Sequence, residues 1–252
     1  MSEDVLLRVV NISKRFGGRV IVDQVSFEVR RGEFMAMIGP NGAGKTTLFN
    51  LISGGVRSES GRIFFKGRDT TNLRPDLLCR RGLSRTFQIN NVFAGASVRE
   101  NIRLAIIAFR GKSWDIVTPS KGLFSDAVEQ MALSVKLHDQ LDRSVQELAY
   151  GDRRRLELAM ALAAEPELIL LDEPTCGVPL VERGPLIELI QSTMERRSMT
   201  ALLIEHDMDI VFSVADRIAV MHRGRLIADD TPDAIQTNEK VHEVYLGGAA
   251  VA

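Results

Sequence analysis

The stretch GPNGAGKTT, residues 39–47, has the residue types and spacing that bind nucleotide phosphates. It satisfies the pattern GxxxxGK[ST] and lies between the apolar EFMAMI and the helical pattern TTLFNLISG, which is the context that this pattern requires. Its glycines allow backbone amides to wrap the phosphates, and the N-terminus of the following helix adds a favourable dipole. We therefore predict a phosphate loop made of Gly39, Pro40, Asn41, Gly42, Ala43, Gly44, Lys45, Thr46 and Thr47.

Two carboxylates at the end of a second apolar run supply the rest of the chemistry. The stretch ELILLDEP, residues 167–174, predicts a buried strand that ends at Asp172 and Glu173. In nucleotide hydrolases of this class, an acid in that position holds Mg²⁺ together with the hydroxyl after the lysine, here Thr46. Lys45 is expected to reach the β- and γ-phosphates. Glu173 is predicted to polarise the attacking water as a general base.

Alternating strands and helices must position these groups. Apolar and β-branched runs predict a hairpin at 217–230 that turns at Arg223-Gly224, and single strands at 5–10, 20–29, 33–39, 61–67, 167–174 and 199–207. The last two of these strands are almost continuously apolar, which is typical of strands buried on both faces of a parallel sheet. The fold class predicted from these elements is α/β.

The middle of the chain, residues 97–164, has a helical pattern instead. A capping box is predicted at Ser97 with Glu100, and the same N-terminal signal recurs at Ser125. A later helix, starting near Gly151, is predicted from a buried stripe formed by Leu156, Ala159, Met160 and Ala163. We interpret the region as a helical lobe inserted into the α/β core, and we expect the tail GGAAVA to be frayed.

The composition restricts the classes of function. A formal net charge of −1 gives no electrostatic reason to expect nucleic-acid binding. Cys79 and Cys176 argue against a disulfide framework and favour a reducing compartment, and Cys176 is expected to be a small buried filler. The acidic N-terminus lacks an apolar signal core, so export is not expected. No apolar run approaches the roughly 18 residues of a membrane span, so other subunits would have to cross a membrane.

Taken in order, the phosphate loop, the helical insertion, the YGDRRR stretch and the LLDEP strand resemble the nucleotide-binding subunit of an ATP-binding cassette (ABC) transporter. The resemblance covers residues 5–248. Within this family the chain looks closest to the ATP-binding subunits of high-affinity branched-chain amino-acid importers. The stretches that carry this likeness are RTFQINNVFAGASVRENI (85–102), LAYGDRRRLELAMAL (148–162), LLIEHDMDIVFSVADRIAVMHRGRLIADDTPDAI (202–235) and VYLG (244–247).

The resemblance implies a fold and a division of the chain. The implied fold is α/β, a P-loop NTPase (RecA-like) core with an N-terminal antiparallel β subdomain and an inserted α-helical lobe. A single ABC ATPase domain is expected over residues 5–248. Its expected parts are a nucleotide-binding core at 1–96 and 165–230, a helical lobe with the signature motif at 97–164, and a C-terminal tail at 231–252.

The resemblance also implies roles for single side chains. Phe16 matches the aromatic residue that stacks on adenine, for which only a π-face is needed. Gln88 in RTFQ matches the glutamine that reaches Mg²⁺ and the attacking water, and His206 in IEHD matches the histidine that contacts the γ-phosphate. Each has a plainer alternative: turn or core packing for Phe16, a solvated side chain for Gln88 and a structural role for His206. The segment after Gln88, including Asn91 and Phe93, is expected to pass motion to membrane-spanning subunits, with core packing as the alternative for Phe93.

In this family two cassettes sandwich two ATP molecules, and the signature segment of one chain completes the site of the other. Where the wider family has LSGGQ, this chain has Leu148, Ala149, Tyr150, Gly151 and Asp152. Ala149 removes one hydroxyl, but the free amides of a helix N-terminus remain, so the phosphate contact is expected to depend on backbone. The run Arg153–Arg155 is expected to be mainly a solvated face. Pro179 stands where an acidic or amide residue is usual, and proline offers neither a side-chain hydrogen-bonding group nor a backbone N–H, so the interface hydrogen bond is not expected to form in the usual way.

The resemblance therefore implies a subunit that binds and hydrolyses ATP with Mg²⁺ and energises an importer. Its solute is expected to be a branched-chain amino acid or a related amide, urea or aromatic acid. The expected partners are two membrane permease subunits, a second ABC ATPase chain in a homo- or heterodimer, and an external solute-binding protein, without nucleic acid. The expected location is peripheral, at the cytoplasmic face of the inner or plasma membrane.

The main alternative is a soluble ABC-type ATPase that acts in DNA repair or translation. Such proteins usually have two fused cassettes, a long coiled coil or zinc-binding cysteines, whereas this sequence has one phosphate loop, no long heptad run and two cysteines. An exporter ATPase is less favoured, because exporter cassettes are often fused to their membrane spans. A P-loop kinase or GTPase gives no reason for LAYGD followed by LLDEP, and the sequence has no NKxD guanine-reading motif.

Overall fold

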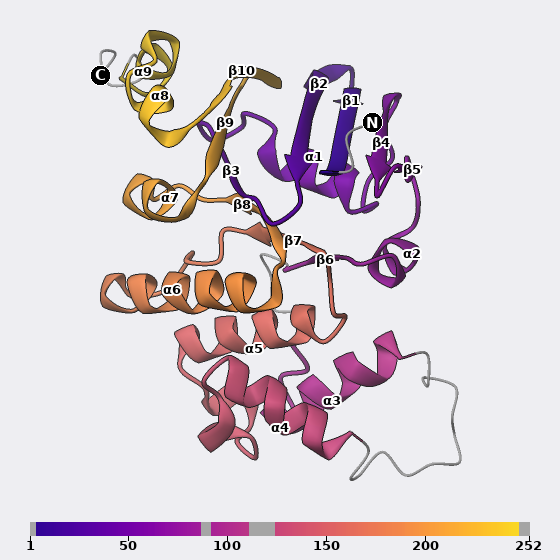
Figure 1. The fold of residues 1–252 in the computed structure, drawn as a ribbon, viewed down its shortest axis with the longest axis vertical. Helices are drawn as coiled ribbons and strands as arrows, with labels where there is room; N and C mark the ends of the chain where they lie inside the picture. Colours follow the sequence, from indigo (N-terminus) through magenta and orange to yellow (C-terminus); the bar gives the residue numbers. More distant parts are fainter. Residues whose placement is uncertain (1–3, 87–91, 111–123, 247–252) are drawn as a thin grey trace.

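The computed structural model describes residues 4–86, 92–110 and 124–246, and these residues form two β-sheets surrounded by helices (Figure 1). The first sheet is antiparallel and has the order β2-β1-β4-β5. Its strands are β1 (Val5–Phe16), β2 (Arg19–Arg30), β4 (Ser60–Phe65) and β5 (Arg68–Asp69). The strands predicted at 5–10, 20–29 and 61–67 are therefore confirmed, and β1 extends well beyond its apolar start.

The second sheet has the order β10-β9-β3-β8-β7-β6. Its strands are β3 (Phe34–Ile38), β6 (Leu83–Arg85), β7 (Leu168–Asp172), β8 (Thr200–Ile204), β9 (Arg217–His222) and β10 (Arg225–Asp230). All neighbours pair in parallel except β9 and β10, which form the predicted hairpin. This arrangement confirms the predicted α/β class, because the phosphate loop and both carboxylates follow strands of one parallel sheet.

Strand β7, which lies between β8 and the edge strand β6, is buried on both faces, as its continuous apolar sequence predicts. Leu168 and Leu170 join a core that includes both sheets and α1 (Lys45–Ile52). Ile169 and Leu171 point the other way, into a core formed with the helices of residues 97–197. The strand is thereby fixed between two layers, and its end at Asp172 is held in place from both sides.

The helices of the middle region pack beneath this sheet. They are α3 (Val98–Phe109), α4 (Ser125–Ser134) and α5 (Tyr150–Leu162), with two short 3₁₀ turns at His138–Gln140 and Val145–Glu147. Figure 1 shows α5 lying between α6 (Leu180–Arg197) and the pair α3 and α4. In the predicted stripe of α5, Leu156, Ala159 and Ala163 are buried and Met160 is partly buried.

The two predicted helix starts have different outcomes. The capping box at Ser97 is confirmed: its hydroxyl accepts from the Glu100 amide at 3.2 Å, and the Glu100 carboxylate accepts from the Ser97 amide at 2.8 Å. The same prediction at Ser125 is wrong, because Ser125 is already the first helical residue. The chain enters α4 through Phe124 in a left-handed conformation, φ 58°, without a side-chain cap.

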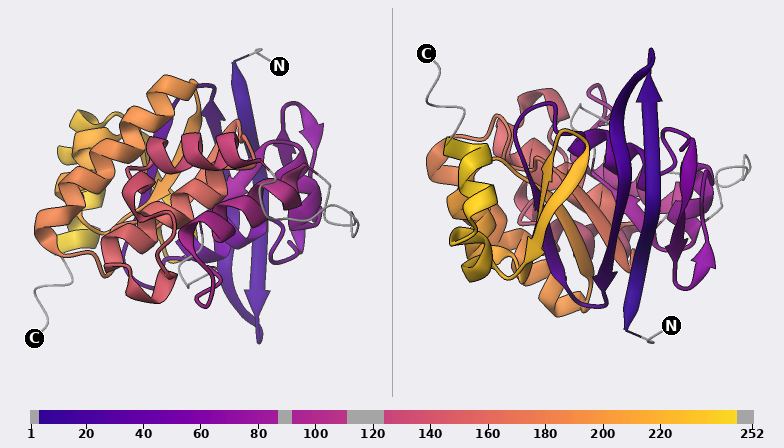
Figure 2. Two further views of the ribbon diagram at one scale, coloured as in Figure 1. Left: turned by 90° about the horizontal axis from the view of Figure 1, so that it is seen from below. Right: turned by 90° about the horizontal axis from the view of Figure 1, so that it is seen from above.

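The remaining described helices lie around the edges of the sheets. They are α2 (Pro75–Arg80), α7 (Met208–Val214), α8 (Pro232–Gln236) and α9 (Glu239–Leu246). Figure 2 shows the yellow C-terminal helices α8 and α9 on the opposite side of the molecule from β4 and β5. The segment interpreted only as a tail thus forms two helices, anchored by Ile235 and Val241 against β3 and β9. The terminal GGAAVA lies outside the described residues.

No helix among the described residues is both long and apolar enough to cross a membrane. The division of the chain at residues 96, 164 and 230 stays a prediction, since the arrangement of elements alone sets no domain boundary.

Candidate functional site

The predicted phosphate loop connects β3 to α1 and is closely fitted to its surroundings. At Gly39, φ 151°, a Cβ atom would collide with the backbone oxygen of Met221, and at Gly44, φ 104°, it would collide with that of Ile21. Glycine is therefore required at both positions by conformation and by space. The backbone amide of Gly224 donates to the Ala43 oxygen at 2.9 Å, which ties the β9–β10 turn to the loop.

A cavity of about 520 Å³ opens in front of this loop. It brings the loop together with Glu173 and His206, which follow β7 and β8. Sequence reasoning missed the other side of the cavity, formed by Arg19, Val20, Ile21, Arg223 and Gly224. The sequence predicts only a hairpin turn at Arg223-Gly224, and no local pattern indicates that this turn lies against residues 41–47. Both arginines add positive charge where an anion is expected.

Lys45 lies folded onto the loop that carries it. Its side chain is 6% exposed, and Nζ donates to the carbonyl oxygens of Gly39 at 2.6 Å and Pro40 at 3.2 Å. Burial lowers the pKa of Lys45, while the nearby charges of Glu173 and Asp172 oppose this shift. The ammonium group thus satisfies backbone acceptors beside the cavity, within the same field as both carboxylates.

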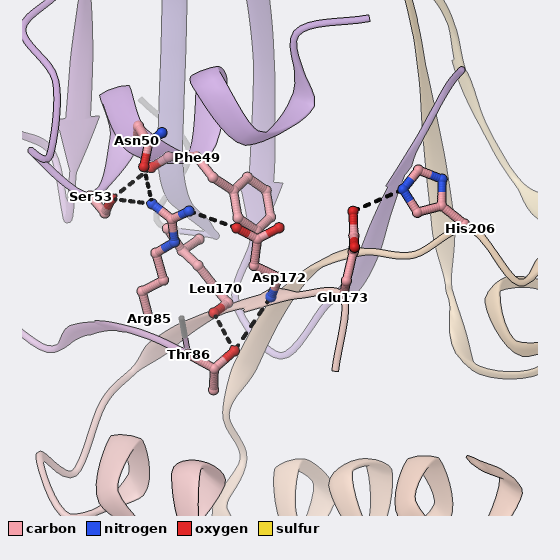
Figure 3. Close-up of polar contacts among 9 residues, drawn as sticks. All are labelled: Phe49, Asn50, Ser53, Arg85, Thr86, Leu170, Asp172, Glu173 and His206. Carbon is pink, nitrogen blue, oxygen red and sulfur yellow. Dashed lines mark hydrogen bonds and ion pairs between the residues drawn. The ribbon is translucent and has the colours of Figure 1, made fainter. Parts of the chain in front are cut away.

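The two adjacent carboxylates point in different directions (Figure 3). Asp172 is buried and accepts from Arg85 Nη2 at 2.6 Å. Burial raises the pKa of the Asp172 carboxyl, and the hydrogen bond and charge of Arg85 oppose that rise. Glu173 has a left-handed backbone, φ 49°, which is costly for a residue other than glycine. This turn after β7 directs its carboxylate to His206, where Oε1 and Nε2 are 2.8 Å apart.

The oxygen donors at this edge of the sheet fit a small hard cation such as Mg²⁺. Asp172 Oδ1 is buried and has no hydrogen-bond partner among the described residues, while Thr46 offers a hydroxyl in the first turn of α1. No cluster of three or more His, Cys, Asp or Glu ligands exists in the described part of the chain. Gln88, the third predicted metal ligand, and Asn91 lie outside the described residues.

Phe16 and Phe93 are both too exposed for the core-packing alternative. Phe16 ends β1 at the hairpin, and its side chain is 48% exposed. It does not line the cavity, but its cross-strand neighbour Arg19 does. The Lys14 ammonium lies 5.1 Å from the ring centroid. Phe93 is 57% exposed.

The signature segment forms the N-terminus of α5. Leu148 is buried, whereas Ala149 and Tyr150 are exposed and Ala149 provides no side-chain cap. A Cβ atom at Gly151 would collide with the carboxylate of Glu182 at the start of α6. Asp152 accepts from Gln140 Nε2 at 2.9 Å and from Arg155 Nη1 at 3.1 Å. The segment thus has an anchored interior and an exposed start.

The expectation of a solvated face for the arginine run behind this segment is wrong at Arg154, which is buried, whereas Arg153 and Arg155 are partly exposed. Arg154 is 7% exposed and donates to Glu157 Oε2 at 2.8 Å, to Tyr150 Oη at 3.0 Å and to the Cys176 carbonyl at 3.1 Å. Arg153 donates to the carbonyls of Leu148 and Gln146. Arg154 is needed inside because it satisfies acceptors that folding buries.

The loop after Glu173 is therefore tied to the signature helix of the same chain. Arg154 reaches the Cys176 carbonyl, and the Tyr150 ring lies against Gly177, φ 78°, where a Cβ atom would be only 2.7 Å away. Cys176 itself is exposed, so its expected role as a buried filler is wrong. Pro179 ends this loop as the residue before α6, and Leu180 and Val181 follow with 75% and 83% exposure.

Comparison with known proteins places these features in a family. Residues 22–176 match the family described as ABC transporter, and residues 225–251 match the one described as branched-chain amino acid ATP-binding cassette transporter. The high-affinity branched-chain amino acid transport ATP-binding protein LivG of Salmonella typhimurium is 38% identical over 97% of this chain and 98% of that protein.

Two further relatives give the same picture. The high-affinity branched-chain amino acid transport ATP-binding protein BraF of Pseudomonas aeruginosa is 36% identical, over 97% of this chain and 98% of its own. A crystal structure of a nucleotide-free ATP-binding cassette from an ABC transporter aligns with a TM-score of 0.81 at 31% identity, covering 96% of this chain and 98% of that one. None of these three names supports the alternative in DNA repair or translation.

Proposed function

The chain belongs to the ABC transporter family as an ATP-binding subunit with ATPase activity, and we propose that it energises an importer of branched-chain amino acids or of a related amide, urea or aromatic acid. One observation carries the importer assignment: the likeness to LivG and BraF runs over nearly the full chain, and its last part matches a family named for branched-chain amino acids. The solute class is taken from those relatives, because an ATPase subunit does not itself contact the solute.

The proposed nucleotide site uses the cavity in front of α1. Residues 39–47 wrap the phosphates with backbone amides, and Lys45 exchanges its carbonyl partners for the β- and γ-phosphates. Phe16, exposed at the nearby hairpin, stacks on adenine. Glu173 accepts a proton from the attacking water, and His206, hydrogen-bonded to Glu173 here, contacts the γ-phosphate.

Thr46 and Asp172 are the proposed ligands of Mg²⁺, with Gln88 as a third contact. The unpartnered Oδ1 of Asp172 supports this assignment, since a buried carboxylate oxygen without a donor is costly. When bound there, Mg²⁺ would neutralise charge on the β- and γ-phosphates. The residues of this chain hold the carboxylate and hydroxyl in place and keep Glu173 turned toward the cavity.

The proposed partner at the ATP-facing surface is a second ABC ATPase chain. Residues 148–152 are proposed to complete the ATP site of that chain. The exposed Ala149 at the start of α5 supports this, because the first amides of a helix have no partner within the helix. Exposed Leu180 and Val181 add apolar surface beside this segment. Binding of two ATP molecules would close the pair, and hydrolysis would release it.

The proposed membrane partners are two permease subunits, with an external solute-binding protein in the full system, which places the chain at the cytoplasmic membrane face. A largely apolar groove of about 480 Å³ lies between α1, α2 and β6 on one side and α3 and α5 on the other. We propose that a helical segment of a permease occupies it, because an importer needs a subunit that spans the membrane and the groove borders Thr86, two residues before Gln88 in the sequence. An Ala108→Trp substitution in the groove is expected to stop co-purification with the permeases and leave nucleotide affinity unchanged.

Reconstitution tests the proposed function. The chain is purified with the permeases encoded beside its gene, placed in proteoliposomes with ATP inside, and supplied with the solute-binding protein and labelled leucine, urea or benzoate. We expect ATP-dependent leucine uptake that Lys45→Ala abolishes. Uptake of urea or benzoate instead would keep the importer and change the solute. ATPase activity stimulated by nucleic acid, without co-purifying permeases, would favour the DNA-repair or translation alternative.

A further inference from the structure

Arg85 connects the proposed metal site to a part of the fold that the ATPase chemistry has not yet used. It ends β6, the edge strand of the parallel sheet, beside β7. Its side chain is 6% exposed and that of its partner Asp172 is fully buried. Nη2 donates to Asp172 Oδ2 at 2.6 Å, while Nη1 donates to Asn50 Oδ1 at 2.6 Å and to Ser53 Oγ at 3.0 Å (Figure 3).

The two ends of this guanidinium reach the two elements that carry the proposed metal ligands. Asn50 and Ser53 lie at the end of α1, and Thr46 lies in its first turn. The spacings of four and three residues place Thr46, Asn50 and Ser53 on one face of that helix. One planar cation therefore fixes the distance between the Thr46 face of α1 and the carboxylate at the end of β7. A lysine could not bridge them in this way, because it lacks the planar fork.

The Asp172 carboxylate is held on one side only. Oδ2 accepts from Arg85, whereas Oδ1 has no partner among the described residues. A buried ion pair that served stability alone would gain little over apolar side chains and would be expected to satisfy both oxygens. The arrangement instead holds one oxygen and leaves the other available to a ligand. The Thr86 hydroxyl also accepts from the Asp172 amide at 3.4 Å, so Arg85 at the end of β6 and the residue that follows it contact both the side chain and the backbone of this aspartate.

We propose that Arg85 is a positioning residue that clamps Asp172 Oδ2 and the Thr46 face of α1, so that Oδ1 is aimed at a divalent cation. Arg85, Asn50 and Ser53 also line the groove between the core and the helical lobe. This inference rests on the proposed metal role of Asp172.

Manganese binding tests the clamp. Mn²⁺ affinity of the full-length chain is measured by electron paramagnetic resonance with a non-hydrolysable ATP analogue, and analogue affinity is measured separately in EDTA. Arg85→Gln is expected to weaken Mn²⁺ binding by about 10- to 100-fold, the usual cost of removing a partner of a metal ligand. Metal-free nucleotide affinity is expected to stay unchanged. Arg80→Gln, which removes the same charge from the same groove, is the matched control and should change neither value.

Wild-type Mn²⁺ affinity in a folded Arg85→Gln variant would overturn the proposal, as would an equal loss of metal-free nucleotide affinity. If Arg85→Gln does not fold, Asn50→Ala combined with Ser53→Ala removes only the α1 end of the clamp and should weaken Mn²⁺ binding selectively. Unchanged binding there would again overturn the proposal. Asp172→Asn tests the proposed metal site separately from the proposed role of Arg85. If this variant leaves Mn²⁺ binding intact, the proposed metal site itself is wrong. If it alone abolishes binding, the inference about Arg85 fails while the metal site stands.

Discussion

The phosphate loop and the signature segment each start a helix with a glycine-containing motif, yet their polar groups are satisfied differently. At α1, Lys45 is buried, and strands β2, β3, β7 and β8 and the β9–β10 turn of the same chain surround the loop. At α5, Ala149 is exposed and offers no cap, while Arg153 and Arg154 brace the segment from behind. The first site is thus almost complete within one chain, and the second is rigid but presents its free amides outward.

This difference between the enclosed phosphate loop and the outward-facing signature segment shows which of the proposed functional groups one chain supplies to its own site. Hydrolysis needs a base, a phosphate cradle and a metal ligand, and the residues proposed for these roles share one edge of one sheet. The proposed completion of the γ-phosphate site needs a second surface, and Arg153 and the buried Arg154 hold the backbone of the segment proposed for that surface.

The largest effect is expected from a substitution that tests whether Glu173, beside the phosphate loop, is the catalytic base. Glu173→Gln keeps the shape of the side chain and removes its charge, so ATP turnover in the assembled complex should fall by about 10²- to 10⁴-fold. Nucleotide affinity, measured by fluorescence titration, should remain. Turnover near the wild-type rate would show that the base lies elsewhere.

The second prediction tests whether Arg154 stabilises the signature segment at the start of α5 through its charge. Arg154→Met leaves Glu157, 8% exposed, without its charge partner, which should lower the free energy of unfolding by about 3–5 kcal/mol in denaturant titrations. Adding Glu157→Met should recover most of that loss, because no unpaired charge then remains. If the double variant is no more stable than the single one, packing of Arg154 rather than charge pairing stabilises α5.

A smaller loss, in this case of nucleotide affinity, is expected from a substitution in the phosphate loop. Lys45→Ala removes a charged donor worth about 1.5–3 kcal/mol, which corresponds to a roughly 10- to 150-fold weaker affinity for a fluorescent ATP analogue. Lys136→Ala, an exposed lysine of the helical lobe, provides the control and should bind normally. Unaltered affinity in Lys45→Ala would mean that backbone amides alone hold the phosphates.

The smallest effect is expected at the exposed start of α5. Ala149→Ser supplies the missing N-cap acceptor and should raise the free energy of unfolding by about 1 kcal/mol. Turnover in the assembled complex should change only modestly, since the backbone makes the proposed phosphate contact. A large loss of turnover would show that residue 149 packs against a partner instead of facing nucleotide.

Local patterns were sufficient to predict much of the fold and to propose part of the candidate site. The loop of residues 39–47, the strands around it and the capping box at Ser97 each depend on neighbouring residues, so their spacing is visible in the chain. The same reasoning failed at Ser125, where Phe124 enters α4 in a left-handed conformation that no local signal demands. It also left α8 and α9 unassigned, because those short helices depend on packing against β3 and β9.

By itself, the sequence determined which segments are proposed for nucleotide chemistry: GPNGAGKTT after a strand and LLDE at the end of another specify local backbone and donor types. Only the tertiary structure decided what surrounds them. It placed Arg85 on Asp172 across 87 positions, brought Arg19 and Arg223 to one cavity, and buried Arg154 where a solvated face was expected. The physical reason is that charge pairing and burial depend on distance in space, and a pattern of adjacent residues carries no information about such distances.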